Sequence, residues 1–129
     1  MSAAKSNYQA WLAKAENDFT NIENNLSATR VPWDTICFHA QQAAEKLLKA
    51  LLVFHAHVPG RTHDLVALLT ECVPVAPTLA QRQQDCQRLS YYAVAARYPS
   101  DVFEPNEKDA REMIEAARRI RSDVLACLP

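Results

Sequence analysis

Glycine is almost missing from this sequence, which has a single one, Gly60, among 129 residues. An average soluble chain of this length has about nine glycines, at a usage of ~7%. Glycine-rich phosphate-binding loops of the P-loop or dinucleotide-binding type are therefore excluded. Hairpin turns, which favour Asn-Gly or Asp-Gly pairs, are nearly excluded as well. The class that remains is an all-α domain.

The sequence also lacks a long apolar run and an excess of charge of either sign. Lys and Arg number 14 and Asp and Glu number 15, which gives a net charge of -1. No stretch approaches the ~18 apolar residues of a membrane span, and charged residues interrupt positions 1–30, so no signal peptide is expected. The balanced charge argues against a basic stripe that binds along a nucleic-acid backbone. A local basic pocket is still compatible with this charge. We expect one soluble, cytoplasmic domain over residues 1–129, without membrane association.

Motifs for a metal or another cofactor are lacking too. Residues 55–57 read His-Ala-His, but side chains two residues apart on a helix point in nearly opposite directions, and no acid or cysteine stands at ligand spacing. We therefore expect no metal and no cofactor. The cysteines form no C-x-x-C pair and are predicted to be small buried hydrophobes in a reducing compartment. They are Cys37, Cys72, Cys86 and Cys127.

Five helical segments are predicted, separated by turns that contain proline. In the first, apolar residues recur at spacings of three and four, which places them on one helix face. The face consists of Ala4, Tyr8, Trp11, Ala15, Phe19, Ile22 and Leu26. The predicted helices cover residues 4–26, 32–56, 64–72, 78–97 and 107–127. The fold class is an antiparallel up-and-down bundle of four to five helices.

The chemistry of the helix ends supports these ranges. Ser2, Thr62 and Asn106 are the predicted N-caps of the first, third and fifth helices. Asp64 is placed in the first turn of the third helix, where its charge suits the helix dipole. Gly60 is predicted as the C′ residue that ends the second helix. The predicted ion pairs at i,i+4 are Glu45–Lys49, Glu107–Arg111 and Glu115–Arg119.

The second helix is apolar on every side from Leu47 to Phe54, except at Lys49. A helix of this kind is buried on every side. Either it lies in the centre of the bundle or a second copy of the protein covers part of it. We favour a second copy, because a bundle of four or five helices rarely surrounds one of its members.

Short connections make consecutive helices antiparallel neighbours. The end of the second helix, the start of the third, the end of the fourth and the start of the fifth should then meet at one end of the bundle. The register of the short third helix against the second is not fixed by this rule. The polar residues predicted to gather at that end are His55, His57, Arg61, His63, Asp64, Arg97, Tyr98 and Asp101.

Three separated motifs resemble those of the HEPN (higher eukaryotes and prokaryotes nucleotide-binding) family. They are FHAQQAAEKLLKALL at 38–52, Thr62-His63-Asp64-Leu65, and Tyr91 or Tyr92 followed by Ala96-Arg97-Tyr98-Pro99. Their order and spacing match over about residues 5–125. The resemblance implies a helical bundle that usually dimerises and is often encoded beside a small nucleotidyltransferase. Many relatives are ribonucleases, often toxins of toxin–antitoxin or phage-defence systems.

The resemblance also implies a catalytic motif, an Arg followed after four to six residues by a His. Arg97 matches the Arg, but the permitted His positions hold Val102, Phe103 and Glu104. The His would move a proton near neutral pH, and an Arg alone does not replace that step. We therefore expect a non-catalytic homodimeric module that binds a nucleotide, an RNA segment or a partner nucleotidyltransferase in a cleft at the dimer interface. The alternative is a ribonuclease that uses Arg97 with another proton carrier.

The candidate site residues each have a structural alternative. In the functional interpretation, Arg97 binds a phosphate and Tyr98 stacks on a base. In the structural alternative, Arg97 caps its own helix or pairs with Asp101, and Tyr98 packs against the bundle. His63 and Asp64 either lie beside a bound phosphate at a helix N-terminus or form a local capping motif. His63 and Tyr98 are the alternative proton carriers. Arg61 and Lys49 complete the predicted ligand-binding set.

Lys49 belongs to the polar side of the second helix, whose other members are Gln41, Gln42, Glu45 and Lys46. The resemblance favours a place in the cleft between subunits for some of them. A face exposed to solvent explains them equally well.

Overall fold

The structure, a computed structural model, describes the backbone of residues 3–97 and 104–129 and the side chains of residues 7–94 and 104–129. Its helices are α1 (Ala3–Leu26), α2 (Trp33–Phe54), α3 (Leu65–Cys72), α4 (Gln83–Arg97) and α5 (Glu107–Ala126), and the 3₁₀ helix η1 (Pro77–Arg82) leads into α4. No strand occurs in the described parts of the chain. The all-α prediction is confirmed. The fourth helix was predicted as one α-helix over residues 78–97, but its first part is the 3₁₀ helix η1 and only the rest is α4.

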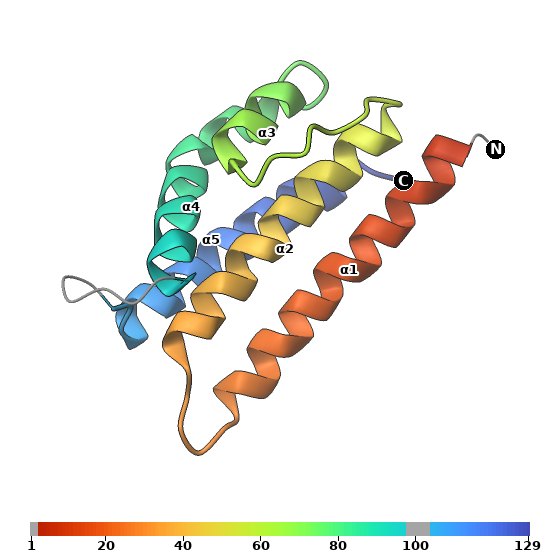
Figure 1. The fold of residues 1–129 in the computed structure, drawn as a ribbon. Coiled ribbons are helices and arrows are strands. Elements are labelled where there is room, and N and C mark those ends of the chain that lie inside the picture. Colours follow the sequence, from red (N-terminus) through yellow and green to blue (C-terminus); the bar gives the residue numbers. More distant parts are fainter. Residues whose placement is uncertain (1–2, 98–103) are drawn as a thin grey trace.

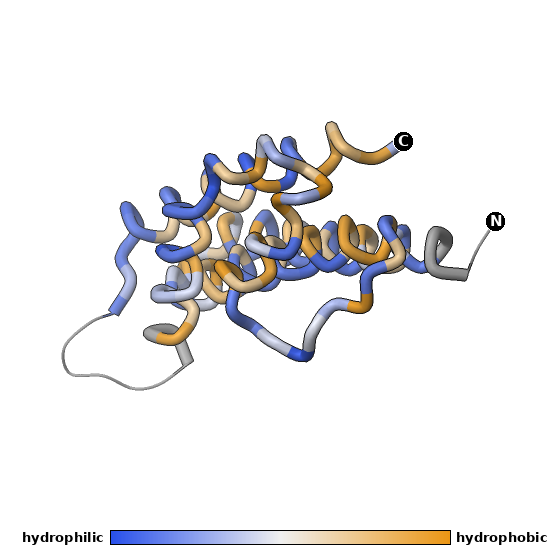
Figure 2. Tube along the Cα trace, turned by 90° about the horizontal axis from the view of Figure 1, so that it is seen from above, coloured by the Kyte–Doolittle hydropathy of each residue, from blue (hydrophilic) through white to orange (hydrophobic). Residues whose placement is uncertain are grey.

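The helix α2 lies in the centre of the bundle. It runs antiparallel to α1, while α5 lies behind it and α3 and α4 lie on the side away from α1 (Figure 1). Hydrophobic and hydrophilic stretches alternate along the helices, as amphipathic helices require (Figure 2). The large side chains that are fully buried come from every helix and are Ile22, Ile36, Leu47, Leu48, Leu51, Leu52, Leu65, Leu68, Leu79, Leu89, Met113 and Ile120.

A second copy is not needed to cover the apolar half of α2. Leu47, Leu48 and Leu51 are 0% exposed and Leu52 is 1% exposed within the single chain. The reason is that α2 contacts α1, α3, α4 and α5, so that its own chain surrounds it. Our preference for a second copy over this surface was therefore wrong, and the central position is correct.

Two helix starts depend on side-chain caps. Asn106 caps α5 in a capping box with Asp109, as predicted. The third helix is capped by Asp64, whose side chain accepts hydrogen bonds from the backbone N–H groups of Val66 and Ala67. Thr62, the predicted cap, lies two residues earlier, and its hydroxyl accepts from the Asp64 N–H. The predicted cap of α1, Ser2, lies outside the described residues.

The end of α2 differs from the predicted one. His55 is the C-cap, and Ala56 follows it in the left-handed region with φ 60°. The N–H of His57 bonds to the carbonyl of Leu52, and the N–H of Ala56 to that of Val53, which together form a Schellman motif. Gly60 does not have a positive φ, so it does not end the helix.

Two of the three predicted i,i+4 ion pairs are present. Lys49 Nζ lies 3.2 Å from Glu45 Oε2, and Arg111 Nε lies 2.8 Å from Glu107 Oε2. The third pair is not formed as predicted, because its two members have other partners. Glu115 pairs with Arg118 at 2.6 Å, one residue closer in sequence, and Arg119 reaches across to Asp85 at 2.8 Å.

The connection between α2 and α3 is a long return segment. From the end of α2, residues 55–64 run back along that helix, so that His63 contacts Glu45 in its middle (Figure 1). The ends of α2 and α4 therefore do not meet, contrary to our prediction. The start of α5 lies instead beside the start of α2, where the Arg111 guanidinium is 5.4 Å from the centre of the Trp33 ring.

Three of the four cysteines are buried, as predicted, and Cys127 is half-buried. Burial, with a smaller contribution from nearby acidic groups, raises the pKa of the thiols of Cys37, Cys72 and Cys86 to about 12. These three thiols therefore act as small apolar side chains of the core.

Candidate functional site

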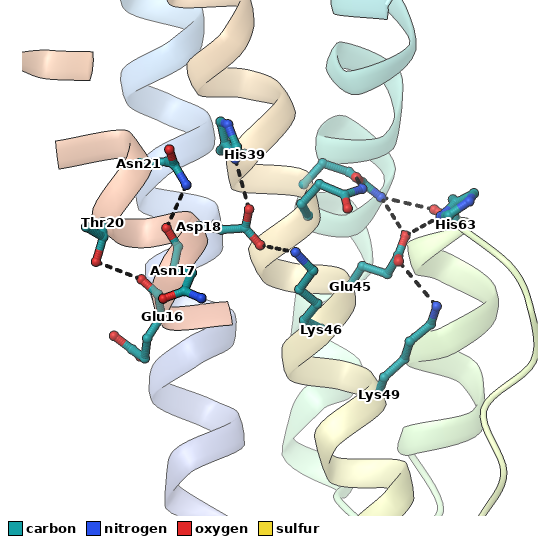
Figure 3. Close-up of polar contacts among 12 residues, drawn as sticks. Glu16, Asn17, Asp18, Thr20, Asn21, His39, Glu45, Lys46, Lys49 and His63 are labelled. Carbon is teal, nitrogen blue, oxygen red and sulfur yellow. Dashed lines mark hydrogen bonds and ion pairs between the residues drawn. The ribbon is translucent and has the colours of Figure 1, made fainter. Parts of the chain in front are cut away.

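A buried carboxylate on α2 holds an exposed imidazole on the α2–α3 connection. Oε1 of Glu45 lies 2.8 Å from Nδ1 of His63, and Oε2 lies 3.2 Å from Nζ of Lys49 (Figure 3). Gln41 donates through Nε2 to the backbone carbonyl of His63 at 3.2 Å and to Glu45 Oε1 at 3.4 Å. These contacts fasten the connection to the middle of α2.

The i,i+4 spacing of Gln41, Glu45 and Lys49 places all three on one face of α2. They are 2%, 4% and 8% exposed, so this face is not the solvated one that the sequence allowed as an alternative. Burying charged groups is costly unless they are paired. The pairing is complete here, since no buried side-chain nitrogen or oxygen in the described residues lacks a hydrogen-bond partner.

The pairing also sets the hydrogen-bonding state of His63. An ionised carboxylate only accepts hydrogen bonds, so Nδ1 of His63 carries the hydrogen that Glu45 accepts. In the neutral imidazole, Nε2 is then an acceptor without a hydrogen. The His63 side chain is 67% exposed, while that of Glu45 is 5% exposed. A buried carboxylate thus orients an accessible base.

His63 lines a pocket of about 270 Å³ between α2, the α2–α3 connection and α4. Ala93 and Val94 of α4 give it an apolar wall. Ser90 lines it too, and its hydroxyl oxygen accepts a hydrogen bond of 3.4 Å from the Leu65 N–H. The full lining is Gln41, His63, Asp64, Ser90, Ala93 and Val94.

The predicted site residues fall into separate groups. His63 and Asp64 share the pocket, and Lys49 is joined to them through Glu45. Arg61 is exposed on the connection. The backbone of Arg97 ends α4, about one helical turn after Ala93 and Val94 of the pocket wall.

The remaining predicted residues at the α4 end, Tyr98 and Asp101, lie outside the described residues, as does the side chain of Arg97.

The other two histidines of the predicted group are elsewhere. His55 and His57 stand at the end of α2, and His57 lines a second pocket of about 360 Å³ beside Trp11 and Val58. This separation follows from the path of the connection, which carries His63 away from the helix end. Within the described residues, no three His, Cys, Asp or Glu side chains are grouped so that they could hold a metal ion.

A second polar cluster was not predicted. Asp18 of α1 is 5% exposed, and its two carboxylate oxygens lie 2.9 Å from Nδ1 of His39 and 2.6 Å from Nζ of Lys46 (Figure 3). The sequence did contain a signal for it. Asp18 stands three residues after Ala15 and four before Ile22, on the buried stripe of α1, where a carboxylate needs partners.

Comparison with known proteins gives one family and two similar structures. The HEPN domain family matches residues 8–127. The crystal structure of TT1696 from Thermus thermophilus is similar with a TM-score of 0.81 and 24% sequence identity, over 94% of this chain and 98% of that one. The crystal structure of ST0689, an archaeal HEPN homologue, is similar with a TM-score of 0.72 and 30% identity, over 92% of this chain and 95% of that one. No curated protein matches the sequence.

Along the helices that the structure describes, no segment is long and apolar enough to cross a membrane.

Proposed function

Because the chain belongs to the HEPN domain family, we propose that it is a nucleotide- or RNA-binding module whose ligand occupies the pocket at His63. The observation that supports this most directly is the placement of an accessible imidazole, held by Glu45, in a pocket whose α4 wall ends one turn before Arg97. Ligand pockets combine apolar walls with a few oriented polar groups, as this one does.

The module is proposed to be non-catalytic by the usual route of the family. Arg97 is followed at the permitted positions by Val102, Phe103 and Glu104, none of which moves a proton as a histidine does near neutral pH. The loss of a general acid or base reduces a rate by about 10²–10⁴-fold. Arg97 retains the bidentate guanidinium that binds phosphate.

Calorimetric titration tests the binding proposal. Ribonucleoside monophosphates and a short single-stranded RNA are titrated into wild type and into His63→Gln, Arg97→Ala and Arg118→Ala. Wild type should bind, and the first two variants should weaken binding by about 10-fold, the value of one good polar contact to a base or phosphate. Arg118, which pairs with Glu115 on the outer face of α5, is the matched control and should bind as wild type does. No binding to wild type would contradict the proposal.

A homodimer is the proposed assembly, with the α4 face beside the pocket as its interface. Tyr91 and Val94 are 59% and 60% exposed on this face, and Val94 also lines the pocket. Exposed apolar side chains that lie together mark contact surfaces. Light scattering should give about twice the chain mass of 14.5 kDa, and Val94→Asp should give the single mass. Wild type at 14.5 kDa in micromolar solution would contradict the dimer.

A small nucleotidyltransferase encoded beside this protein is the proposed macromolecular partner, in a toxin–antitoxin or defence system. The family resemblance supports this proposal. Where the neighbouring gene encodes such an enzyme, the two proteins should copurify after coexpression with a tag on only one of them. Complete separation on a gel-filtration column would contradict it.

Ribonuclease activity is the second candidate, and the Glu45–His63 pair is the observation that favours it. A carboxylate that orients an imidazole with a free Nε2 is the arrangement of a general base. Incubation of total RNA with purified protein tests it. Cleavage that is lost in both His63→Gln and Arg97→Ala would replace the non-catalytic proposal, whereas intact RNA with wild type would leave binding as the function.

A further inference from the structure

The wall of the His63 pocket has an unusual charge for a nucleotide site. Asp64 is its only charged residue in the part of the chain that the structure describes, and no Lys or Arg lines it. A phosphate inside the pocket would face this carboxylate and would be repelled. The uncharged part of a nucleotide is therefore the part that fits inside, and the phosphate is left at the rim.

The polar atoms of the wall are mostly hydrogen-bond acceptors. The two hydrogen bonds that Asp64 accepts, from Val66 and Ala67, both end on Oδ1, and Oδ2 has no partner in the described residues. A carboxylate has about four acceptor sites, so Oδ2 keeps two. In the neutral imidazole, Nε2 of His63 is a further acceptor. The Ser90 hydroxyl already accepts from Leu65 and therefore has its hydrogen free to donate.

We infer that this pocket takes a nucleobase and that it selects guanine, with Asp64 as the residue that determines specificity; this inference rests on the proposed nucleotide binding. The Watson–Crick edge of guanine presents two adjacent donors, N1–H and N2–H, and one acceptor, O6. Oδ2 of Asp64 accepts from the donors, the Ser90 hydroxyl donates to O6, and Ala93 and Val94 contact the face of the ring.

The other bases present fewer donors to a carboxylate. Adenine has one amino group next to the acceptor N1, and cytosine likewise has one amino group next to an acceptor. The single N3–H of uracil lies between two carbonyls, which a carboxylate repels. A site built to accept hydrogen bonds discriminates strongly against a ligand that lacks the donors, because its own polar groups then stay unpaired.

The test compares three purine ribonucleotides by calorimetry against wild type and Asp64→Asn. They are guanosine, inosine and adenosine 5′-monophosphate, and the inosine compound is the matched ligand because it keeps N1–H but lacks the 2-amino group. Guanosine monophosphate should bind wild type about 10-fold more tightly than adenosine monophosphate, with the inosine compound between them. In Asp64→Asn this preference should fall below about 3-fold, because an amide presents fewer acceptor sites than a carboxylate.

Asn is as good an N-cap as Asp, so Asp64→Asn should keep α3 folded, and Asp64→Ser is a second variant that also caps. Thermal unfolding measures whether both variants remain folded. Equal binding of the three nucleotides to wild type would overturn the guanine inference and leave nucleotide binding intact. An unchanged preference in the two variants would overturn the role of Asp64. No binding of any nucleotide would contradict the proposed function, and the inference with it.

Discussion

Nδ1 of His63 lies 2.8 Å from Oε1 of Glu45, and the two residues differ sharply in their environment. The carboxylate belongs to the core of the bundle, whereas the imidazole is two-thirds exposed at the wall of the pocket. The same contact that orients the imidazole also fixes the return path of residues 55–64 along α2. The orientation of the pocket imidazole and the path of the α2–α3 connection therefore share this contact.

Replacing Glu45 by Gln should lower the stability of the protein. Lys49, 8% exposed, would lose its countercharge, and an unpaired buried charge costs about 3–5 kcal/mol. Urea denaturation of Glu45→Gln should show a loss of this size.

A double variant provides the control for Glu45→Gln. Removing both charges in Glu45→Gln/Lys49→Met should restore most of the lost stability, because replacing a buried ion pair by uncharged groups is often neutral. A Glu45→Gln variant as stable as wild type would contradict the predicted contribution of the Glu45–Lys49 ion pair to stability.

The helices could be predicted from the sequence because their signals are local. The apolar spacing of Tyr8, Ala15 and Ile22 defines the buried face of α1, and a single side chain, Asn106, fixes the start of α5. The near absence of glycine excluded the competing fold classes, and the prolines marked the turns between the helices. Such features act within a few residues along the chain, so the chain itself displays them.

The assembly of the site could not be predicted, because contacts between distant residues determine it. The rule of short connections placed His63 with His55 at the helix end, whereas Glu45 and Gln41 bind it about three to four turns earlier on α2. The sequence left open whether these two α2 residues line a cleft between subunits or face solvent, since their i,i+4 spacing does not reveal what packs on them. Asp18 was missed although it interrupts an apolar stripe, which is a usable signal.

The end of α2 gives a prediction about backbone strain. Ala56 has φ 60°, a conformation that glycine adopts without the steric cost of a Cβ. Ala56→Gly should therefore stabilise the protein by about 0.5–1 kcal/mol, measured by urea denaturation.

Gly60→Ala is the matched control for Ala56→Gly. Gly60 does not have a positive φ, and a Cβ there would lie 4.0 Å from its nearest neighbour, a methyl group of Thr62. This variant should be neutral or slightly more stable. A loss of stability in Ala56→Gly would contradict the assignment of Ala56 as the residue that ends the helix.

The Asp18 cluster should contribute to the attachment of α1 to α2. Asp18→Asn removes the buried charge that Lys46 and His39 contact, and the loss of hydrogen bonds to a charged group costs about 1–3 kcal/mol. Glu16→Gln on the same helix is the control, because Glu16 pairs with Arg121 at the surface, where such pairs contribute about 0–1 kcal/mol. Equal effects of the two variants in thermal unfolding would show that burial of Asp18 has no energetic consequence.

Stability should fall at alkaline pH because three thiols are buried. Burial raises the pKa of Cys37, Cys72 and Cys86 from the ordinary value of 9.0 to about 12. Between these values the unfolded chain loses thiol protons that the folded chain keeps. Below about pH 9 these thiols should not affect the free energy of unfolding. Above about pH 9 each thiol should lower the free energy of unfolding by up to about 1.4 kcal/mol for every pH unit.

Urea denaturation at a series of pH values from about 8 to about 11 measures this slope. Cys86→Ala should reduce the slope by the contribution of one thiol. The same slope in Cys86→Ala and wild type would mean that the Cys86 thiol ionises as readily in the folded protein as in the unfolded one.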